Sequence, residues 1–287
     1  MRKNPFKEIY KSSEYILNKD NKMPLIVDVE LTNNCNLSCK MCSRANMCRK
    51  KGFMDRDTFE KLVDECKKYG IPMRFIGWGE PFLHPEIISY LKYAKPLLLH
   101  ITNNGQIIRE DQMEELVDMR LDSIIFSFQG ATKEGYESMR VGASYDKTVE
   151  NINKLIDIRG NKDKPFIHIS STMTDETEAE KKAFISKWKK IVDSVDIGIT
   201  NLHNENRIPQ YKPCSEVWHK LTVKWDGSVS ACCGDYDDTL LVGDLTTSTL
   251  KEIWKGEELK AVRTLLTSGR FRNLTLCKNC FYAYNFS

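Results

Sequence analysis

Short apolar runs alternate with amphipathic stretches along the first two thirds of the chain. Each run is rich in β-branched or aromatic residues and lies between turn formers, which is typical of a buried strand. The six runs are residues 25–31, 73–78, 97–102, 123–128, 166–172 and 195–200. Between them apolar residues recur at helical spacing, as at Phe59, Leu62, Val63 and Cys66. Six strand–helix repeats predict an α/β fold with a parallel sheet, open or barrel-like, and right-handed crossovers.

The pattern changes after Thr200. Residues 201–213 are polar and rich in turn formers, which is typical of a linker. The next stretch predicts a β-hairpin over 221–232 with its turn at 225–227, followed by a helix over 250–266. A C-terminal unit this small commonly needs a structural metal site for stability. We therefore expect an N-terminal helical extension (1–24), a barrel-like domain (25–203) and a small C-terminal α+β domain of hairpin plus helix (204–287).

Composition and charge narrow the class of protein. The 287 residues are 41% hydrophobic and 29% charged, the balance of a globular enzyme-sized chain. A net charge of +3 is too mild to indicate a nucleic-acid partner. No apolar run approaches the roughly 20 residues of a membrane span, and the first 20 residues lack the apolar core of a signal peptide. We expect a cytoplasmic protein with neither nucleic acid nor membrane as partner.

Ten cysteines in a cytoplasmic chain need an explanation other than disulfides, because the cytosol keeps thiols reduced. They fall into two groups and one isolated residue, Cys66. The first group is Cys35, Cys39 and Cys42, with Cys48 just beyond; the second is Cys214, Cys232, Cys233, Cys277 and Cys280. Metal ligation by thiolates at two separate sites is the favoured interpretation.

The first group has the spacing C-x3-C-x2-C and directly follows the first predicted strand. Three thiolates on one short loop can hold three corners of a cubane iron–sulfur cluster, whereas a closed cluster takes four cysteine ligands. The missing ligand leaves one iron open to a small molecule, by the logic of open catalytic metal sites. A structural zinc site with Cys48 as its fourth ligand fits the same spacing.

The second group is complete in ligands. Cys214, Cys232 and the Cys277-x2-Cys280 pair make a closed four-cysteine site, which suits a structural zinc or a fully ligated iron–sulfur cluster; the spacing does not separate the two. Successive residues of a strand face opposite sides. If Cys232 faces the metal, Cys233 faces away, where it serves packing or donates hydrogen to a substrate radical.

Four more motifs follow the predicted strands in order. They are GWGEP at 77–81, TNNG at 102–105, SFQG at 127–130 and YESMRVG at 136–142. Together with C-x3-C-x2-C they resemble the signature of the radical SAM superfamily, over residues 25 to about 203. This resemblance implies a partial (β/α)6 barrel that binds S-adenosylmethionine and an open [4Fe–4S] cluster held by Cys35, Cys39 and Cys42.

The resemblance also implies the cofactor contacts and the chemistry. Gly79 and Glu80 would receive the amino group of S-adenosylmethionine and Arg140 its carboxylate, while Met41 would cover the adenine. The full set of matching positions is Met41, Gly79, Glu80, Asn103, Ser127, Arg140 and His203. An external one-electron donor such as flavodoxin or ferredoxin would reduce the cluster. The cofactor would then yield a 5′-deoxyadenosyl radical, which abstracts hydrogen from a C–H bond.

The C-terminal unit resembles the SPASM/twitch extensions of radical SAM enzymes. The better match is the twitch form, which holds one auxiliary cluster. This implies one auxiliary [4Fe–4S] cluster held by Cys214, Cys232, Cys277 and Cys280. Its similarity to the twitch dehydrogenase type of aminocyclitol biosynthesis implies a small-molecule substrate, a sugar or cyclitol alcohol oxidised to a ketone. Two alternatives remain open: a peptide (RiPP) maturase or epimerase, with Cys233 as the hydrogen donor, and a zinc-stapled binding protein that is no enzyme.

Other conspicuous residues have plainer explanations. Cys66 lies on the apolar face of a helix and is expected in the core, and Cys48 is expected to be an ordinary loop cysteine. His84 precedes a proline in a turn, and His168 alternates within a strand, so both are expected to be structural. The basic run 49–51 is typical of a solvated face, with attraction of an anionic substrate as the alternative.

Overall fold

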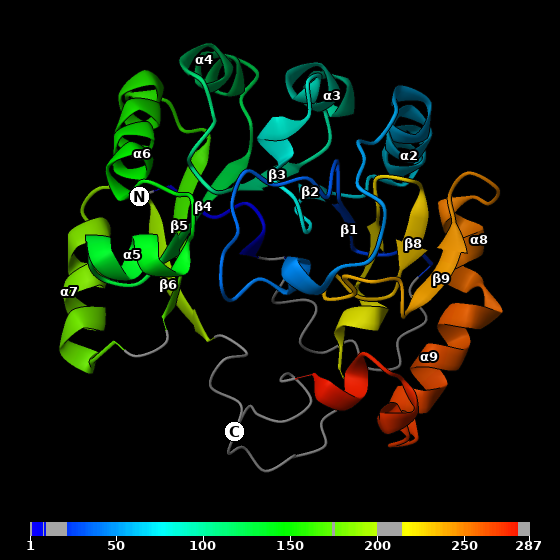
Figure 1. Cartoon of the computed structure of the whole chain (residues 1–287). Coiled ribbons are helices and arrows are strands. Elements are labelled where there is room, and N and C mark those ends of the chain that lie inside the picture. Colours follow the sequence, from blue (N-terminus) through cyan, green and yellow to red (C-terminus); the bar gives the residue numbers. More distant parts are fainter. Residues whose placement is uncertain (1, 8, 10–21, 174–175, 200–213, 281–287) are drawn as a thin grey trace.

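The computed structural model describes residues 2–7, 9, 22–173, 176–199 and 214–280. Its described strands form one sheet in the order β6-β5-β4-β3-β2-β1-β7-β8-β9. The six predicted strands are confirmed as the parallel strands β1 (Ile26–Val29), β2 (Met73–Phe75), β3 (Leu99–Asn103), β4 (Ser123–Gln129), β5 (Phe166–Met173) and β6 (Ser194–Ile199). Figure 1 shows the sheet curving around an inner space with helices outside it. The fold is the α/β partial (β/α)6 barrel that the motifs implied.

Helices cover the outer side of the curved sheet. They are α2 (Arg56–Tyr69), α3 (Ile87–Ala94), α4 (Glu110–Asp118), α5 (Lys133–Met139), α6 (Tyr145–Arg159) and α7 (Glu178–Trp188). Local sequence fixes their ends. Asp55 caps α2 by accepting a hydrogen bond from the Thr58 amide (2.8 Å), and Gly70 ends it in the left-handed conformation (φ 66°). Cys66 is fully buried on the apolar face of α2, as expected.

The two faces of the sheet differ in polarity. Outward side chains such as Val27, Phe75 and Phe126 are buried against the helices. The inward face of the same strands is polar and includes Asp28, Glu30, Arg74, His100, Ser123, Ser127, His168 and Asp196. Arg74 donates two hydrogen bonds to Asp28 (2.6 and 2.8 Å). Polar side chains on the inner wall of the barrel are suited to binding a polar ligand, whereas a packed core would be lined by apolar side chains.

The C-terminal unit continues the barrel sheet. β7 (Lys220–Val223) pairs in parallel with β1, and β8 (Ser228–Ser230) and β9 (Leu241–Asp244) add antiparallel strands beyond it. The predicted hairpin is confirmed, with Gly227 at its turn (φ 86°). The sheet itself therefore has no break between the two predicted domains. The boundary predicted at 203/204 lies outside the described residues.

The helix predicted over 250–266 is two helices. α8 (Leu250–Lys255) and α9 (Glu257–Thr267) meet at Gly256, whose backbone is extended (φ −66°, ψ 159°). Glycine is poorly suited to a helix interior because it loses the most conformational freedom there. The helical spacing runs through this position, which is why the pattern alone predicted one helix.

Part of the predicted N-terminal extension closes the amino-terminal end of the barrel; most of its predicted helix lies outside the described residues. Arg2 donates hydrogen bonds to the carbonyl oxygens of Gly160 and Lys162 (3.1 and 2.8 Å). Phe6 is 2% exposed and packs edge-on against His100, with ring centroids 5.5 Å apart. The segment thus seals the end of the barrel opposite the strand termini that carry the motifs.

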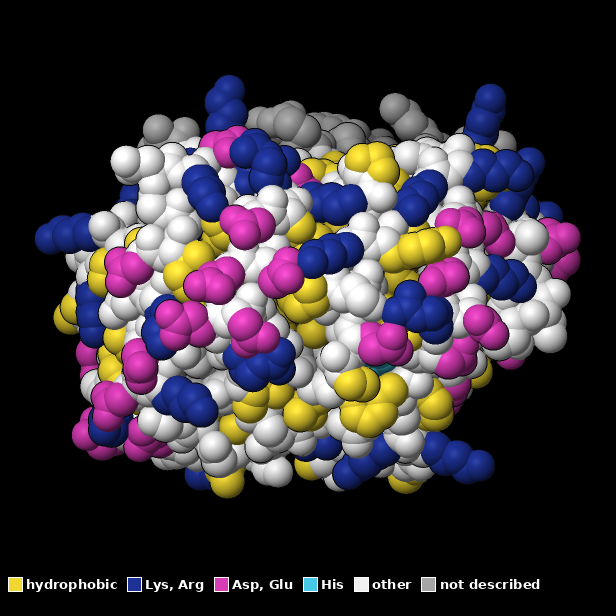
Figure 2. Space-filling model, turned by 90° about the horizontal axis from the view of Figure 1, so that it is seen from above, with side chains coloured by type: hydrophobic (Ala, Val, Ile, Leu, Met, Phe, Trp, Pro, Cys, Tyr) yellow, Lys and Arg dark blue, Asp and Glu magenta, His cyan; other side chains and the backbone are white. Residues whose placement is uncertain are grey.

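The helical outer face carries mixed charges. Figure 2 looks onto this side, and Lys and Arg side chains alternate there with Asp and Glu. Such interspersed charge is typical of a solvated surface. None of the helices that the structure describes is long and apolar enough to cross a membrane.

We predict that Phe6→Ala lowers the free energy of unfolding by about 3 kcal/mol, because it empties a buried aromatic site. Phe53→Ala is the matched control, since Phe53 is 43% exposed, and should cost less than about 1 kcal/mol. Urea unfolding of both variants measures the difference. Equal costs would mean that the N-terminal segment does not dock on the barrel.

Candidate functional site

The three cysteines of the first group lie on the loop between β1 and α2, which enters the inner space of the sheet (Figure 1). Two main-chain hydrogen bonds hold this loop against the end of α5. The Ser38 amide donates to the Val141 carbonyl and the Lys40 amide to the Met139 carbonyl, both at 2.9 Å. The cysteine loop therefore lies beside the segment that carries Arg140. Its three thiols are partly exposed.

The electrostatics of the loop favour neutral thiols until a cation is present. Burial raises the pKa of Cys35 and of Cys39, and the nearby guanidinium of Arg140 offsets part of this rise at Cys39. Arg44 donates a hydrogen bond to the Leu37 carbonyl (2.6 Å) and lowers the pKa of both thiols slightly. A bound metal centre deprotonates such thiols, so the loop is suited to cationic clusters.

Main-chain contacts hold the segment after β2 against the start of the cysteine loop. A Cβ atom on Gly79 would lie 2.5 Å from the Asn34 carbonyl oxygen and closer still to that of Thr32, so only glycine fits. The Glu80 amide donates to the Asn34 carbonyl (2.8 Å). The Glu80 carboxylate is buried and accepts hydrogen bonds from the amides of Phe82 (3.1 Å) and Asn104 (2.7 Å). Glu80 thereby joins the loops that follow β1, β2 and β3.

The two asparagines of the turn after β3 have different hydrogen-bond partners. The Asn103 amide group is used within the turn, donating to the Ile125 carbonyl (2.9 Å) and accepting from the Gly105 amide (2.8 Å). Asn104 faces the cysteine loop, donating to the Asn36 side chain (2.8 Å) and lying 3.9 Å from the Cys35 sulfur. Asn103 as a cofactor contact stays a prediction; Asn104 was missed because both asparagines fit the motif.

Buried polar groups without partners gather near the end of β4. Arg140 is buried, donates to the Phe128 carbonyl (3.3 Å) and leaves its Nε unpaired. Gln129 is fully buried with both amide atoms unpaired, and Ser127 lies half-buried on the same inward side of β4. Buried polar atoms of this kind are expected to meet a ligand or water. Alternation with Ser127 was the sequence signal that could have identified Gln129.

The other predicted residues of this site are placed as follows. Met41 lies half-buried on the cysteine loop between Cys39 and Cys42. His203 lies outside the described residues. Cys48 is exposed, and its sulfur lies 3.9 Å from the Asn46 carbonyl of its own loop. His84 is structural as expected, because its ring contacts the Met54 carbonyl (2.9 Å) beneath the loop.

The four cysteines predicted as the second site line one pocket. Cys214 precedes the short helix η4 (Glu216–Trp218), Cys232 follows β8, and Cys277 and Cys280 lie at the start and just past the end of the short helix η6 (Cys277–Asn279). The pocket is lined by Cys214, Cys232, Cys277 and Cys280 with Glu216, Val217, Leu240, Leu266, Phe271 and Leu276. Burial raises the pKa of Cys214 to about 12 and that of Cys277 to about 11. No three His, Cys, Asp or Glu side chains of the described residues converge on a single metal ion; the four thiols share a pocket instead.

The prediction that Cys232 and Cys233 face opposite ways is wrong, because both residues lie after β8 (Ser228–Ser230) and strand alternation does not apply to them. Their thiols interact: Cys233 raises the pKa of Cys232, and Cys232 lowers the pKa of Cys233. The Cys232 sulfur lines the pocket and accepts a hydrogen bond from the Gly234 amide (3.3 Å). Cys233 is exposed, and its sulfur lies 3.3 Å from the ammonium nitrogen of Lys220. It is not a fifth pocket residue. The other role considered for it, hydrogen donation, stays a prediction.

We predict that Gly79→Ala lowers the free energy of unfolding by about 2 kcal/mol, because the new methyl group meets two main-chain carbonyls that cannot yield cheaply. Gly198→Ala is the matched control. A Cβ there has its nearest neighbour at 3.9 Å, so its cost should stay within about 0.5 kcal/mol. Thermal or urea unfolding measures both. A Gly79→Ala protein as stable as wild type would contradict the close packing of the two loops.

The buried Glu80 makes stability depend on pH. Burial raises its pKa to about 7, against the opposing effect of two amide hydrogen bonds and Arg140. A carboxyl whose pKa is raised by folding stabilises the protein most when protonated, so its contribution falls as pH rises from about 4.5 to about 7. The metal-free wild type should therefore lose about 2 kcal/mol relative to Glu80→Gln between pH 5 and pH 8. Urea unfolding at both pH values tests this, and parallel profiles would contradict it.

Comparison with known proteins matches both parts of the chain. The radical SAM superfamily model matches residues 29–187, and the model of the SPASM iron–sulfur cluster-binding domain matches residues 214–281. A relative matched along most of its length is the S-adenosyl-L-methionine-dependent 2-deoxy-scyllo-inosamine dehydrogenase of Niallia circulans, 21% identical over 90% of this chain and 93% of that protein. The crystal structure of BtrN in complex with AdoMet and 2-DOIA shares the fold, with a TM-score of 0.62, 18% identity and coverage of 91% of this chain and 94% of that one.

Other relatives match over a shorter region. The PqqA peptide cyclase of Gluconobacter oxydans is 30% identical over 42% of this chain and 34% of that protein. The chain spans less than half the length of several such curated relatives. The radical SAM match alone covers more than half of the chain, and together with the SPASM match it establishes that the chain belongs to the radical SAM superfamily and carries a C-terminal SPASM domain.

Proposed function

We propose that the chain is a radical SAM dehydrogenase that oxidises a small polar alcohol, of the sugar or cyclitol type, to a ketone. The observation that carries the proposal is the pair of cysteine groups, three on the β1 loop and four around one pocket. A site with three protein ligands leaves room for an exogenous ligand, whereas a site with four is complete and suits electron transfer.

The family brings S-adenosylmethionine and a [4Fe–4S] cluster as cofactors, and the SPASM domain brings further iron–sulfur ligation. The residues on the β1 loop fit the first cluster, because three thiols share one bend next to the positive charge of Arg140. Arg140 Nε and the Gln129 amide are buried and unpaired, which fits a ligand with a carboxylate and hydroxyl groups. The four-cysteine pocket fits one auxiliary [4Fe–4S] cluster.

When bound, S-adenosylmethionine and the cluster supply a 5′-deoxyadenosyl radical, after an external donor such as flavodoxin or ferredoxin gives one electron. Residues of the chain position the cofactor and bound the space for the substrate. Glu80 and Asn104 hold the three motif loops in one arrangement, and Arg140, whose Nε has no partner, would anchor the cofactor carboxylate. The cysteine loop and the polar inner wall bracket the space in which the alcohol would bind.

Oxidation of an alcohol to a ketone removes two electrons and two protons. One hydrogen atom leaves the carbinol carbon with the radical, so one electron and one proton remain. The electron needs an acceptor within the protein, which is the role we assign to the four-cysteine site. The proton needs a base, and imidazole is the usual side-chain base near neutral pH. We propose His168, paired with Asp196 on the inward face of β5 and β6, as this base in place of the structural role expected from its strand position.

Peptide modification is the second candidate. It is favoured by the match to a peptide cyclase and by the thiol of Cys233, which is not among the residues that line the four-cysteine pocket. In an epimerase this thiol would return a hydrogen atom to a peptide radical, and Cys233→Ala would then stop turnover after the first abstraction. In the proposed dehydrogenase the same variant keeps forming ketone.

Mutations in the two cysteine groups should affect different steps of the reaction. We predict that the triple variant Cys35→Ala/Cys39→Ala/Cys42→Ala forms no 5′-deoxyadenosine. Cys277→Ala/Cys280→Ala should still form 5′-deoxyadenosine, with deuterium transferred from a labelled alcohol, and yield no ketone. Anaerobic incubation followed by mass spectrometry measures both products.

The metal content is the control. Wild-type protein purified without oxygen should hold about eight irons as two cubane clusters, and each variant about four. Zinc in place of iron would support the zinc-stapled binding protein instead. Undiminished ketone formation by the Cys277→Ala/Cys280→Ala variant would remove the electron-acceptor role.

A further inference from the structure

Arg49 lies seven residues after Cys42, in a basic run expected to be solvated. The structure contradicts this expectation for Arg49 itself, whose side chain is 4% exposed, so it is also not free to attract an anionic substrate. Its guanidinium donates two hydrogen bonds to Glu30, both at 2.9 Å, and the Glu30 side chain is 2% exposed. Burial lowers the pKa of Arg49, and the hydrogen bonds and charge of Glu30, together with the charges of Asp238 and Asp226, raise it by more. A buried bidentate pair of this kind is geometrically specific.

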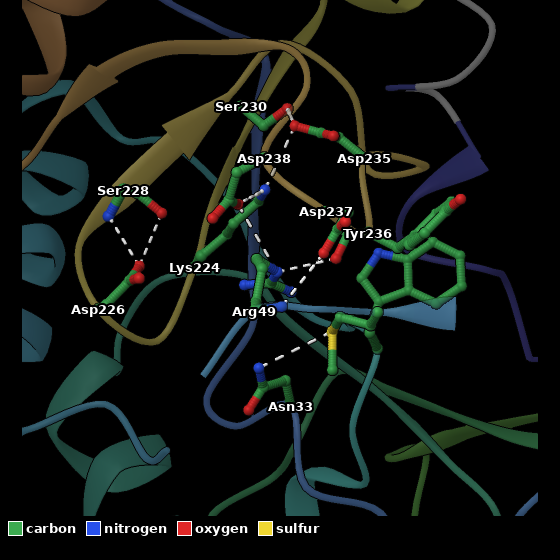
Figure 3. A network of polar contacts seen from close by, with 12 residues as sticks. Asn33, Arg49, Lys224, Asp226, Ser228, Ser230, Asp235, Tyr236, Asp237 and Asp238 are labelled. Atoms are coloured by element: carbon green, nitrogen blue, oxygen red, sulfur yellow. Dashed lines mark hydrogen bonds and ion pairs between the residues drawn. The ribbon is translucent and has the colours of Figure 1, made fainter. Parts of the chain in front are cut away.

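Arg49 also contacts the loop that follows Cys232 (Figure 3). Its Nε donates to the Tyr236 carbonyl (2.8 Å) and lies 3.6 Å from the Asp238 carboxylate. The backbone amides of Cys48 and Arg49 both donate to one oxygen of Asp237, at 2.6 and 3.1 Å. We call these contacts of residues 48–49 with Glu30 and with residues 236–238 the Arg49 bridge.

Each end of the bridge is fixed to one cysteine group. On the C-terminal side, Asp235 accepts hydrogen bonds from Ser230 (2.9 Å) and from the Leu240 amide (3.0 Å), and its own amide donates to the Cys232 carbonyl (3.1 Å). The ammonium group of Lys224 is buried between Asp235 and Asp238. Figure 3 shows these side chains grouped around Arg49. The loop that carries Cys232 is therefore held in one conformation.

On the barrel side the bridge joins the other motifs. Asn33 donates to the Lys50 carbonyl (2.7 Å) and accepts from the Gly52 amide (3.0 Å), which fastens the chain after Arg49 to the start of the cysteine loop. Glu30 also accepts a hydrogen bond from the Trp78 amide (3.2 Å), and the Trp78 ring packs edge-on against Tyr236 at 5.7 Å. The bridge thus ties the cysteine loop and the GWGEP segment to the C-terminal unit.

We propose that Arg49 is a positioning residue that fixes the four-cysteine site at a set distance from the three-cysteine loop. This inference rests on the proposed function, in which an electron left on the substrate must reach the second site. The rate of electron transfer falls steeply with the distance between donor and acceptor, so a displaced four-cysteine site would accept the electron more slowly. The bridge connects the two units through one side chain and two backbone amides, in addition to the direct pairing of β1 with β7.

The test compares Arg49→Lys with Arg159→Lys. Lysine keeps the charge at position 49 and loses the paired donors. Arg159 is the matched control, since it is also 4% exposed and forms a buried ion pair with Asp193, away from both cysteine groups. Arg49→Lys should raise the ratio of 5′-deoxyadenosine to ketone about tenfold, and Arg159→Lys should leave it unchanged. Equal ratios in the two variants would overturn the proposal.

Two measurements do not depend on turnover. In metal-free protein, hydrogen exchange at the Cys48 and Arg49 amides should accelerate about tenfold in Asp237→Ala and stay near wild type in Asp237→Asn, whose carbonyl still accepts. In the doubly reduced protein, electron paramagnetic resonance should show a weaker magnetic interaction between the two clusters in Arg49→Lys than in Arg159→Lys. If the magnetic interaction between the clusters is the same in Arg49→Lys and in Arg159→Lys, the proposal is overturned, whichever product the enzyme forms.

These measurements distinguish the positioning role of Arg49 from the proposed dehydrogenase function. Absence of any ketone in wild type, with a cluster interaction that still depends on Arg49, contradicts the dehydrogenase function and supports the positioning role. Ketone formation that is insensitive to Arg49 contradicts the positioning role and leaves the dehydrogenase function supported. If Arg49→Lys does not fold, the Asp237→Ala and Asp237→Asn pair gives the same comparison.

Discussion

The position of β1 inside the sheet is the constraint on which the site depends. β1 pairs in parallel with β2 on one side and with β7 on the other. Because parallel strands end at the same edge, the loop after β1 is held between the motif loops of the barrel and the C-terminal unit. Three cysteines on that loop therefore face both the cofactor motifs and the route to the second cysteine group.

Buried charges hold this arrangement together. Asp28 is paired with Arg74 and Lys220 across β1, β2 and β7, and Glu30 is paired with Arg49 at the end of β1. Removal of one partner from such a pair leaves an uncompensated buried charge, which is strongly destabilising. The pairs join the same strand to its two neighbours and to the loop above it, so they favour one register of the sheet and one position of the loop.

Sequence patterns predicted the local features well. The six strands and the hairpin follow from side-chain alternation, which needs no knowledge of distant partners. The same alternation failed for Cys232 and Cys233, because β8 ends at Ser230 and the two thiols interact beyond it. The four cysteines of the second site were predicted to lie together from their number and spacing, and they line one pocket. The split at Gly256 was missed because one glycine is compatible with a continuous helical pattern.

Non-local contacts could not be predicted in the same way. Nothing in residues 220–223 states that this strand pairs with β1, about 190 residues earlier in the chain. A basic run is usually solvated, and the burial of Arg49 depends on Glu30 and on Asp237, which lie 19 and 188 residues away. Which of the two asparagines, Asn103 or Asn104, faces the cysteine loop likewise depends on contacts that form only in the folded turn.

The central claim is that one chain holds one open and one closed iron–sulfur site. Electron paramagnetic resonance of the reduced protein, with and without S-adenosylmethionine, tests it most directly. We expect the cofactor to change the signal that depends on Cys35, Cys39 and Cys42 and to leave unchanged the signal that depends on Cys277 and Cys280. A cofactor-induced change in the second signal, or none in the first, would contradict the account.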